Sequence, residues 1–333
     1  MRRGLSMVTL NDIAKMANVS KSTVSRYLNN GSVSQKTKEK LDKIVQETGY
    51  QPNIMAQNLK ASKSNMVGVI IPRYDSPSTN QVLKGFDAIA YPKNIQLVMT
   101  NADLDIGRTK QNLALLQRQK VGAIILFATE IDKELANQIK SSKIPIIIVG
   151  QKLEGNPSFI FQDYDAGQAI GQHAIDLGHK KLLFVGVTET DYAVGVLRKQ
   201  GFYDVAKAHG ADVEFIETEF SRSYNYEKAL EYLTETDATY IAAATDHIAI
   251  GISNASAKLR KEIPEELSLS GFGGYSVTQN VYPHITTVNY PYYKMGEKVM
   301  EEIVKVLDSK DYTIAEKTEL PVELNVQGST QKI

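Results

Sequence analysis

Apolar positions recur at helical spacing in the first fifty residues, which predicts three short helices. The first begins at Thr9, whose spacing to Asp12 is that of a capping box. A tight turn separates it from the second helix, which covers residues 21–28. The third begins at Ser34 and ends before Gly49, the residue type that most often terminates helices.

The second predicted helix has a polar outward face. Val24 and Leu28 point inward, and Ser20 is placed to cap the helix. The outward residues are small or cationic donors, namely Lys21, Ser22, Thr23, Ser25 and Arg26. This pair of helices matches a helix-turn-helix whose second helix enters the DNA major groove. A small helical bundle with a solvated polar face is the alternative.

The charge distribution favours the DNA-binding interpretation. The formal net charge is zero, but residues 1–63 hold 11 Lys and Arg against four acidic residues. Residues 64–333 hold the other 27 basic residues and 34 acidic ones. A basic end on an acidic body indicates a polyanionic partner for the first segment only.

Composition excludes several classes of site and location. The chain has no cysteine, so disulfides and thiolate metal sites are excluded, and its five histidines lack metal-like spacing. We therefore expect neither a metal nor a cofactor. Because residues 1–8 lack the apolar core of a signal peptide and no run of about 18 apolar residues occurs, we expect a cytoplasmic protein without a membrane partner.

Residues 52–64 could form one or two helical turns, with Met55, Ala56 and Leu59 on one side. This segment is too short to hold a helix alone, so DNA or a second copy of the chain must order it. Leu59 is then placed to enter the minor groove as an apolar wedge. An inert linker is the alternative.

From residue 65 onward, apolar runs alternate with amphipathic segments. Strands are predicted in one set at 66–71, 96–100, 123–127 and 144–149, and in a second set at 182–187, 213–216 and 240–244. Continuous β-branched runs indicate strands buried on both faces, hence parallel, doubly wound sheets with covering helices. Two successive sets predict an α/β fold with two similar lobes.

Polar residues follow several of these strands. Ligands bind beyond the carboxyl ends of strands in such sheets. The candidates there are Arg73, Tyr74, Asp75, Ser76, Gln151, the loop 188–198, Thr245, Asp246, His247, Gly273, Gly274, Tyr275 and Ser276. Amides, carboxylates and Arg bind hydroxyl pairs, while aromatic faces stack on sugar rings, so the set indicates a sugar or polyol. Taken singly, Asp75 and Asp246 are also explained as turn or helix caps, and Arg198 as part of a surface ion pair.

The motifs of the N-terminal segment resemble those of the lac repressor (LacI/GalR) family. They comprise residues 9–28, Asn29, Val33, 49–53 and 56–59, and the resemblance extends over essentially the whole chain. It implies that Lys21, Ser22 and Arg26 face base edges, that Thr23 and Ser25 bind phosphates, and that Leu59 is a paired wedge. The complete implied DNA-binding set is Thr9, Ser20, Lys21, Ser22, Thr23, Ser25, Arg26, Asn29, Asn53, Ala56 and Leu59.

The same resemblance implies a periplasmic-binding-protein-like core that binds an effector. Arg198 matches the anchoring Arg, and Thr245-Asp246 matches a polar pair of the family, whereas Gly273 and Gln162 replace acidic residues. The segments 73–76 and 271–275 are most similar to the sucrose- and trehalose-type repressors. The implied effector set is Arg73, Tyr74, Asp75, Ser76, Gln151, Phe161, Arg198, Thr245, Asp246, Gly273 and Tyr275.

These patterns predict three parts: a DNA-binding domain at 1–52, a hinge at 53–64 and a two-lobed domain at 65–333. The expected lobes are about 65–161 with 290–321, and 162–289 with 322–333. We expect a homodimeric repressor of carbohydrate genes that a sugar releases from operator DNA. The sugar is a disaccharide or its phosphate, with sucrose favoured. A sugar carrier and a sugar-modifying enzyme are the alternatives, and no catalytic motif supports an enzyme.

Overall fold

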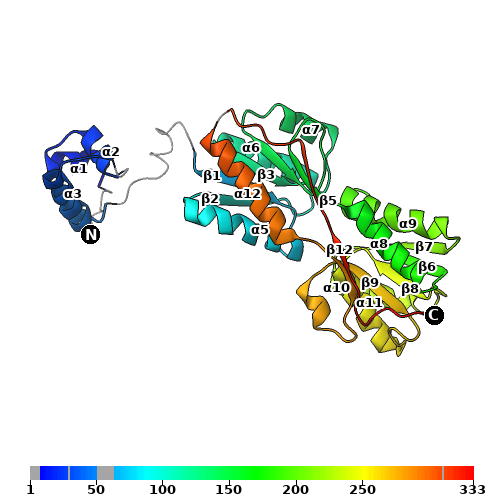
Figure 1. Cartoon of the computed structure of the whole chain (residues 1–333). Coiled ribbons are helices and arrows are strands. Elements are labelled where there is room, and N and C mark those ends of the chain that lie inside the picture. The colour runs from blue at the N-terminus through cyan, green and yellow to red at the C-terminus, as the bar shows by residue number, and fades with distance from the viewer. Residues whose placement is uncertain (1–7, 29–30, 51–63, 310) are drawn as a thin grey trace. The chain divides into compact units, whose positions relative to one another are not determined.

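The computed structural model describes residues 8–28, 31–50, 64–309 and 311–333 (Figure 1). These residues form two compact units, which belong to residues 1–63 and 64–333. Four residues of the implied DNA-binding set lie outside the described residues: Asn29, Asn53, Ala56 and Leu59. The hinge proposed for 53–64 lies outside them as well, except for Ser64.

The first unit contains the three helices expected from the sequence. They are α1 (Leu10–Ala17), α2 (Lys21–Leu28) and α3 (Gln35–Thr48). The capping box is confirmed, because the Asp12 carboxylate accepts from the Thr9 amide at 2.9 Å and the Thr9 hydroxyl accepts from the Asp12 amide. Gly49 ends α3 with φ of 61°, a left-handed conformation that glycine adopts at little cost.

A small apolar core holds these helices together. Its buried members are Ile13, Ala14, Ala17, Val24 and Leu41. The Tyr27 hydroxyl donates to Asp42 and so ties α2 to α3. Because the apolar side of α2 is used in this core, its polar side remains exposed.

The first lobe of the second unit is built on a parallel sheet. Among the described residues its strands follow the order β2-β1-β3-β4-β5-β11. Their bounds are β1 Met66–Ile71, β2 Gln96–Asn101, β3 Ala123–Phe127, β4 Ile146–Val149, β5 Ser158–Phe161 and β11 Lys317–Leu320. Side chains alternate between two buried cores, so that Val69 and Ile125 face one side and Ile70 and Ile124 the other.

Helices cover both faces of this sheet (Figure 1). Those on one face are α5 Pro77–Ala90 and α12 Tyr292–Asp308, and those on the other are α6 Ile106–Arg118 and α7 Lys133–Lys140. A short 3-10 turn, Tyr91–Lys93, follows α5. The first lobe is therefore a three-layered doubly wound structure.

The second lobe repeats the same strand order. Its sheet runs β7-β6-β8-β9-β10-β12, with an antiparallel contact only between β10 and β12 among the described strands. The strands are β6 Lys181–Gly186, β7 Asp212–Glu217, β8 Tyr240–Ala243, β9 Ser268–Gly273, β10 Thr286–Asn289 and β12 Glu323–Asn325. The α/β class with parallel, doubly wound sheets is thus confirmed.

The helices of the second lobe also lie on both sides of its sheet (Figure 1). They are α8 Asp163–Asp176, α9 Arg198–Ala208, α10 Arg222–Tyr232 and α11 Asp246–Leu259. A π-helical turn, Tyr192–Leu197, leads into α9, and a 3-10 turn, Ser276–Gln279, follows β9. Within the described part of the chain, every helix is too short or too polar to span a membrane.

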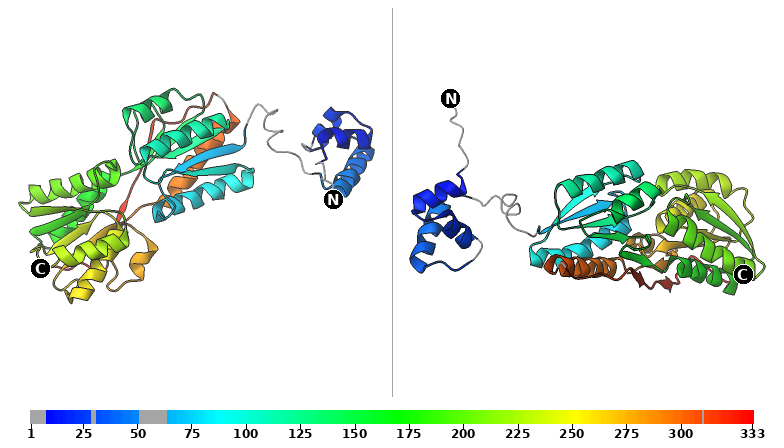
Figure 2. Two further views of the ribbon diagram at one scale, coloured as in Figure 1. Left: turned by 180° about the vertical axis from the view of Figure 1, so that it is seen from behind. Right: turned by 90° about the horizontal axis from the view of Figure 1, so that it is seen from above.

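Three stretches of chain connect the lobes (Figure 2). They run from β5 to α8, from β10 to α12 and from β11 to β12, so each lobe is built from separate parts of the sequence. The helices beside these stretches pack in two close pairs, α5 with α12 and α8 with α9.

Glycine allows the close approach in both pairs. A Cβ atom on Gly296 would lie 2.1 Å from the Val82 carbonyl oxygen, and one on Gly201 would lie 2.1 Å from that of Tyr164. Both distances are far inside van der Waals contact, and the obstructing atoms are backbone. A larger residue therefore forces the helices apart.

We predict that Gly296→Ala lowers the free energy of unfolding by roughly 1–3 kcal/mol, the usual cost of overpacking, despite the better helix propensity of alanine. Gly107→Ala is the matched control, since a Cβ there meets only the Asp105 side chain at 3.0 Å on an exposed stretch of α6. Urea unfolding measures both. A Gly296→Ala protein as stable as the Gly107→Ala protein contradicts the close-packing argument.

Candidate functional site

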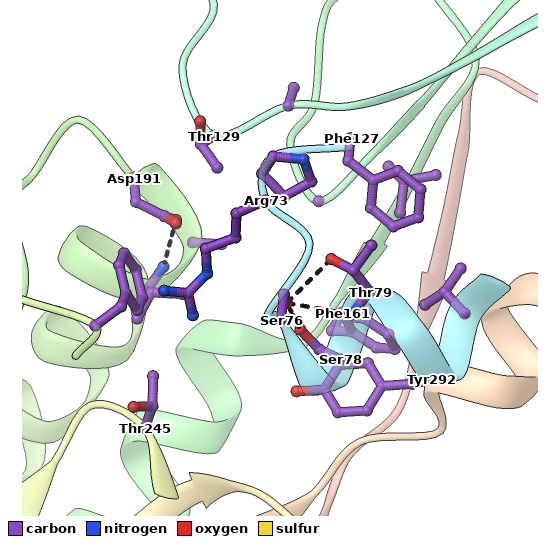
Figure 3. Close-up of a pocket in the computed structure, with 18 of the residues that line it drawn as sticks. Arg73, Ser76, Ser78, Thr79, Phe127, Thr129, Phe161, Asp191, Thr245 and Tyr292 are labelled. Atoms are coloured by element: carbon purple, nitrogen blue, oxygen red, sulfur yellow. Dashed lines mark hydrogen bonds between the residues drawn. The ribbon is translucent and has the colours of Figure 1, made fainter. Parts of the chain in front are cut away.

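A cleft lies where the carboxyl ends of the two sheets face each other. In a sheet of this strand order, the order reverses between the first and third strands of the lobe, and ligands bind at this topological switch point. The cleft is lined by loops after β1 and β3 of the first lobe and after β6 and β8 of the second. Each of these four loops contributes a lining residue that Figure 3 labels, namely Arg73, Thr129, Asp191 and Thr245.

Hydroxyl groups line the wall formed by the first lobe. Ser76 caps α5, and its oxygen accepts from the Thr79 hydroxyl at 3.0 Å and lies 3.0 Å from that of Ser78. Arg73 extends across the cleft (Figure 3), with its guanidinium 4.8 Å from the centroid of the Phe220 ring in the second lobe. The same side chain lies 3.5 Å from the Asp75 carboxylate.

Aromatic rings form the inner end of the cleft. Phe127, Phe161, Tyr275 and Tyr292 line it, and the Phe161 and Tyr292 rings meet edge to face at 5.3 Å. Tyr290 stacks behind Tyr292 with centroids 5.4 Å apart and an angle of 10° between the rings. Such planar apolar surfaces suit the C–H face of a sugar ring.

A buried ion pair supports the wall formed by the second lobe. Arg198 donates from Nε to Asp163 at 2.8 Å and from Nη1 to the Ala244 carbonyl at 2.9 Å. The Tyr290 hydroxyl donates to the same Asp163 oxygen at 2.9 Å. Only 6% of Arg198 and 3% of Asp163 is exposed. Burial raises the pKa of Asp163, while the charge of Arg198 and the donated hydrogen bonds oppose that rise.

Asp246 lies behind the cleft and organises the loop after β9. Its carboxylate accepts from the Thr287 hydroxyl and, at 2.7 Å, from the amide of Tyr275. Burial raises the pKa of Asp246 to about 6. A Cβ on Gly273, whose φ is 139°, would lie 2.7 Å from the Tyr275 ring. A side chain at 273 is therefore incompatible with this position of Tyr275.

The structure brings together six of the eleven effector-binding candidates. Those that line the cleft are Arg73, Ser76, Phe161, Arg198, Thr245 and Tyr275. The other five do not line it. Tyr74 is 66% exposed, Asp75 lines a neighbouring outer groove, and Gln151 donates to the Thr129 carbonyl from behind the wall. Asp246 and Gly273 support Tyr275, as described above.

Several lining residues were not among the candidates. They include Ser78, Thr79, Phe127, Asp163, Phe220 and Tyr292, whereas Asp191 and His247 belong to loops that the sequence indicated. Burial and the charges of Arg73 and Arg222 lower the pKa of His247, so this ring is neutral near pH 7. The polarity of the loop 188–198 predicts a lining residue there, but it does not distinguish the Asp191 carboxylate from its neighbours.

The polar face of α2 presents the predicted DNA-binding residues. Lys21, Ser22 and Arg26 are exposed, and Thr23 and Ser25 are half-buried. The Ser20 hydroxyl accepts from the Thr23 amide at 3.1 Å, which caps α2 as expected. Thr9 is engaged with Asp12 at the start of α1. The donors therefore gather on one helix whose other side is fixed in the core.

Comparison with known families identifies both units. Residues 9–53 match the model described as bacterial regulatory proteins, lacI family, and residues 172–330 match a periplasmic binding protein-like domain. The sucrose operon repressor of Staphylococcus xylosus is 39% identical over 306 residues, which cover 90% of this chain and 94% of that protein. The chain belongs to the lacI family. The resemblance inferred from the motifs is thus confirmed.

Two further known proteins match over nearly the whole chain. Catabolite control protein A of Staphylococcus xylosus is 27% identical over 332 residues, covering 97% of this chain and 99% of that protein. The lac repressor dimer bound to operator and the anti-inducer ONPF has a TM-score of 0.88 at 22% identity, covering 98% of this chain and 100% of that one. This structural likeness shows a shared fold.

We predict that Asp163→Asn lowers the free energy of unfolding by roughly 3–5 kcal/mol, because it leaves the buried Arg198 charge without its partner. The control is Asp237→Asn, which breaks an exposed pair with Lys181 and changes stability little. Urea unfolding of both variants checks this. Equal stability of the two variants contradicts the importance assigned to the buried pair.

Proposed function

We propose that this lacI-family protein is a homodimeric, sequence-specific repressor of a carbohydrate-utilisation operon, which a sugar in the cleft releases from operator DNA. The observation that carries the proposal is the combination of an exposed donor face on α2 with a hydroxyl- and aromatic-lined cleft on the same chain. The helix-turn-helix argues against the sugar-carrier and enzyme alternatives, and the relatives described above are regulators.

The proposed DNA contacts are those that the family resemblance implies, and the exposure of the polar face of α2 supports them. Lys21, Ser22 and Arg26 are exposed and are proposed to reach base edges, while Thr23 and Ser25 are proposed to hold phosphates. A guanidinium makes two parallel hydrogen bonds to guanine, so Arg26 carries most of the base discrimination in this proposal. Two copies of the chain read the two halves of a pseudo-palindrome.

The proposed ligand is a disaccharide or its phosphate, with sucrose ahead of trehalose. Stacked tyrosines and three neighbouring hydroxyls suit one sugar ring. Arg73, Phe220 and His247 line both the inner cleft and the outer groove, so a second ring has polar space to enter. The 39% identity to a sucrose operon repressor supports sucrose.

We predict that sucrose weakens operator binding by this protein. Fluorescence anisotropy with duplexes that the protein selects from a random library measures affinity with and without sucrose, trehalose and their 6-phosphates. The coupling expected for such a switch is about 1–3 kcal/mol, or 5–150-fold in affinity. Mannitol, which has hydroxyls but no ring, is the control. Equal affinity with every sugar rejects sugar-induced release.

We predict that Arg26→Ala weakens binding to the selected duplex by roughly 1–3 kcal/mol and relaxes the preference at one base pair. Lys43→Ala, which removes a charge from the exposed side of α3, is the control and leaves base preference unchanged. Competition with single-base variants of the duplex measures the preference. An Arg26→Ala protein with the original base preference refutes the assignment of this side chain.

A further inference from the structure

Two carboxylates are found among the described residues that line the inner cleft. They belong to Asp163 and Asp191. One oxygen of Asp163 already accepts from both Arg198 and Tyr290, so this carboxylate is used inside the wall. Asp191 lies on the loop between β6 and α9 and has a different environment.

The backbone fixes Asp191 in place. Its Oδ1 accepts from the amide of Val194 at 3.1 Å, and its own carbonyl accepts from the amide of Gly195 at 2.7 Å. Among the described residues, no hydrogen bond to Oδ2 is observed. Figure 3 shows the side chain at the cleft, on the side toward which Arg73 extends. One carboxylate oxygen therefore holds the loop, and the other is available to a ligand.

The charges around Asp191 come from three elements. Arg198 on α9 and Arg73 after β1 attract its negative charge, and Asp163 at the start of α8 repels it. Burial nevertheless raises the pKa of Asp191 to about 6. A carboxylate that has lost water gains strongly from new hydrogen-bond donors, because bonds to a charged acceptor are the stronger ones.

We propose that Asp191 accepts hydrogen bonds from hydroxyl groups of the sugar and thereby determines which sugars the cleft binds. This inference rests on the proposed function. The Tyr275 ring occupies the space beside Gly273, so among the described lining residues Asp191 is the carboxylate with an oxygen left for a ligand. A sugar whose hydroxyls at this place are absent or blocked leaves the carboxylate desolvated and unpaired, and so binds weakly.

The proposal gives sugar binding a defined pH dependence. Ligand hydroxyls stabilise the ionised carboxylate, so binding lowers the pKa of Asp191 from its value of about 6 in the free protein. Affinity is therefore highest above pH 6 and falls as pH decreases through 6. Burial and nearby arginines lower the pKa of His247, which also lines the cleft, so this ring does not gain a proton as pH falls from 8 to 7.

Calorimetric titration of the full-length protein with sucrose between pH 5.5 and 8 tests the proposal. We predict that Asp191→Asn weakens sucrose binding about tenfold or more at pH 8 and removes the pH dependence around 6. Asparagine keeps an oxygen for the Val194 amide, so the loop retains its cap. Asp191→Glu, which displaces the charge by one methylene, weakens binding but keeps a pH dependence.

Glu189→Gln is the matched control. It removes the same charge two residues earlier in the same loop, but its side chain is 67% exposed and pairs with Lys199. Sucrose affinity and its pH profile should be unchanged. If Asp191→Asn binds sucrose as wild type does at every pH, the Asp191 inference is rejected while the repressor proposal stands. If neither sucrose, trehalose nor their 6-phosphates bind the wild-type protein, both proposals fail.

Discussion

The buried pair of Asp163 and Arg198 is the interaction on which the two-lobed unit depends most. Asp163 begins α8 directly after one connection between the lobes, and Tyr290, which donates to it, lies in a second connection. Arg198 begins α9 and also binds the carbonyl that follows β8. Because desolvating both charges is costly, the arrangement tolerates little change in geometry, and it therefore fixes the paths of these connections beside the cleft.

Two close helix pairs stabilise the lobes on either side of this ion pair. Contact through glycine joins α5 to α12 in one lobe and α8 to α9 in the other, with backbone atoms as the neighbours in each case. Close-packed interfaces of this kind have low compressibility and so resist internal rearrangement. A change of angle between the lobes is therefore concentrated in the three connections, where Phe161, Tyr290 and Tyr292 surround the ion pair and also reach or support the cleft.

The parts predicted correctly from the sequence are those whose signal is local. The run Ala123–Phe127 is uniformly apolar and forms β3, and the Thr9 and Asp12 capping box begins α1 where expected. The sequence prediction lacked α12 and β12. For α12 the signal is present, because Met295, Val299, Met300 and Ile303 recur at helical spacing. For β12 it is absent, because this strand has three residues and forms through a long-range antiparallel contact. The residues that line the cleft show the same limit. The loops at the strand ends are predictable from the sequence, but whether the Asp191 side chain points into the cleft depends on how the loop after β6 folds.

The charges of the cleft bear on which form of the proposed sugar ligand suits it. Among the described lining residues, two arginines, Arg73 and Arg198, face two aspartates, Asp163 and Asp191, and His247 is neutral near pH 7. Arg198 is already neutralised by Asp163. A phosphate would have Arg73 as its main partner and would meet the negative charge of Asp191 close by. An uncharged disaccharide avoids this repulsion and donates to the carboxylate, so the balance favours sucrose over its phosphate.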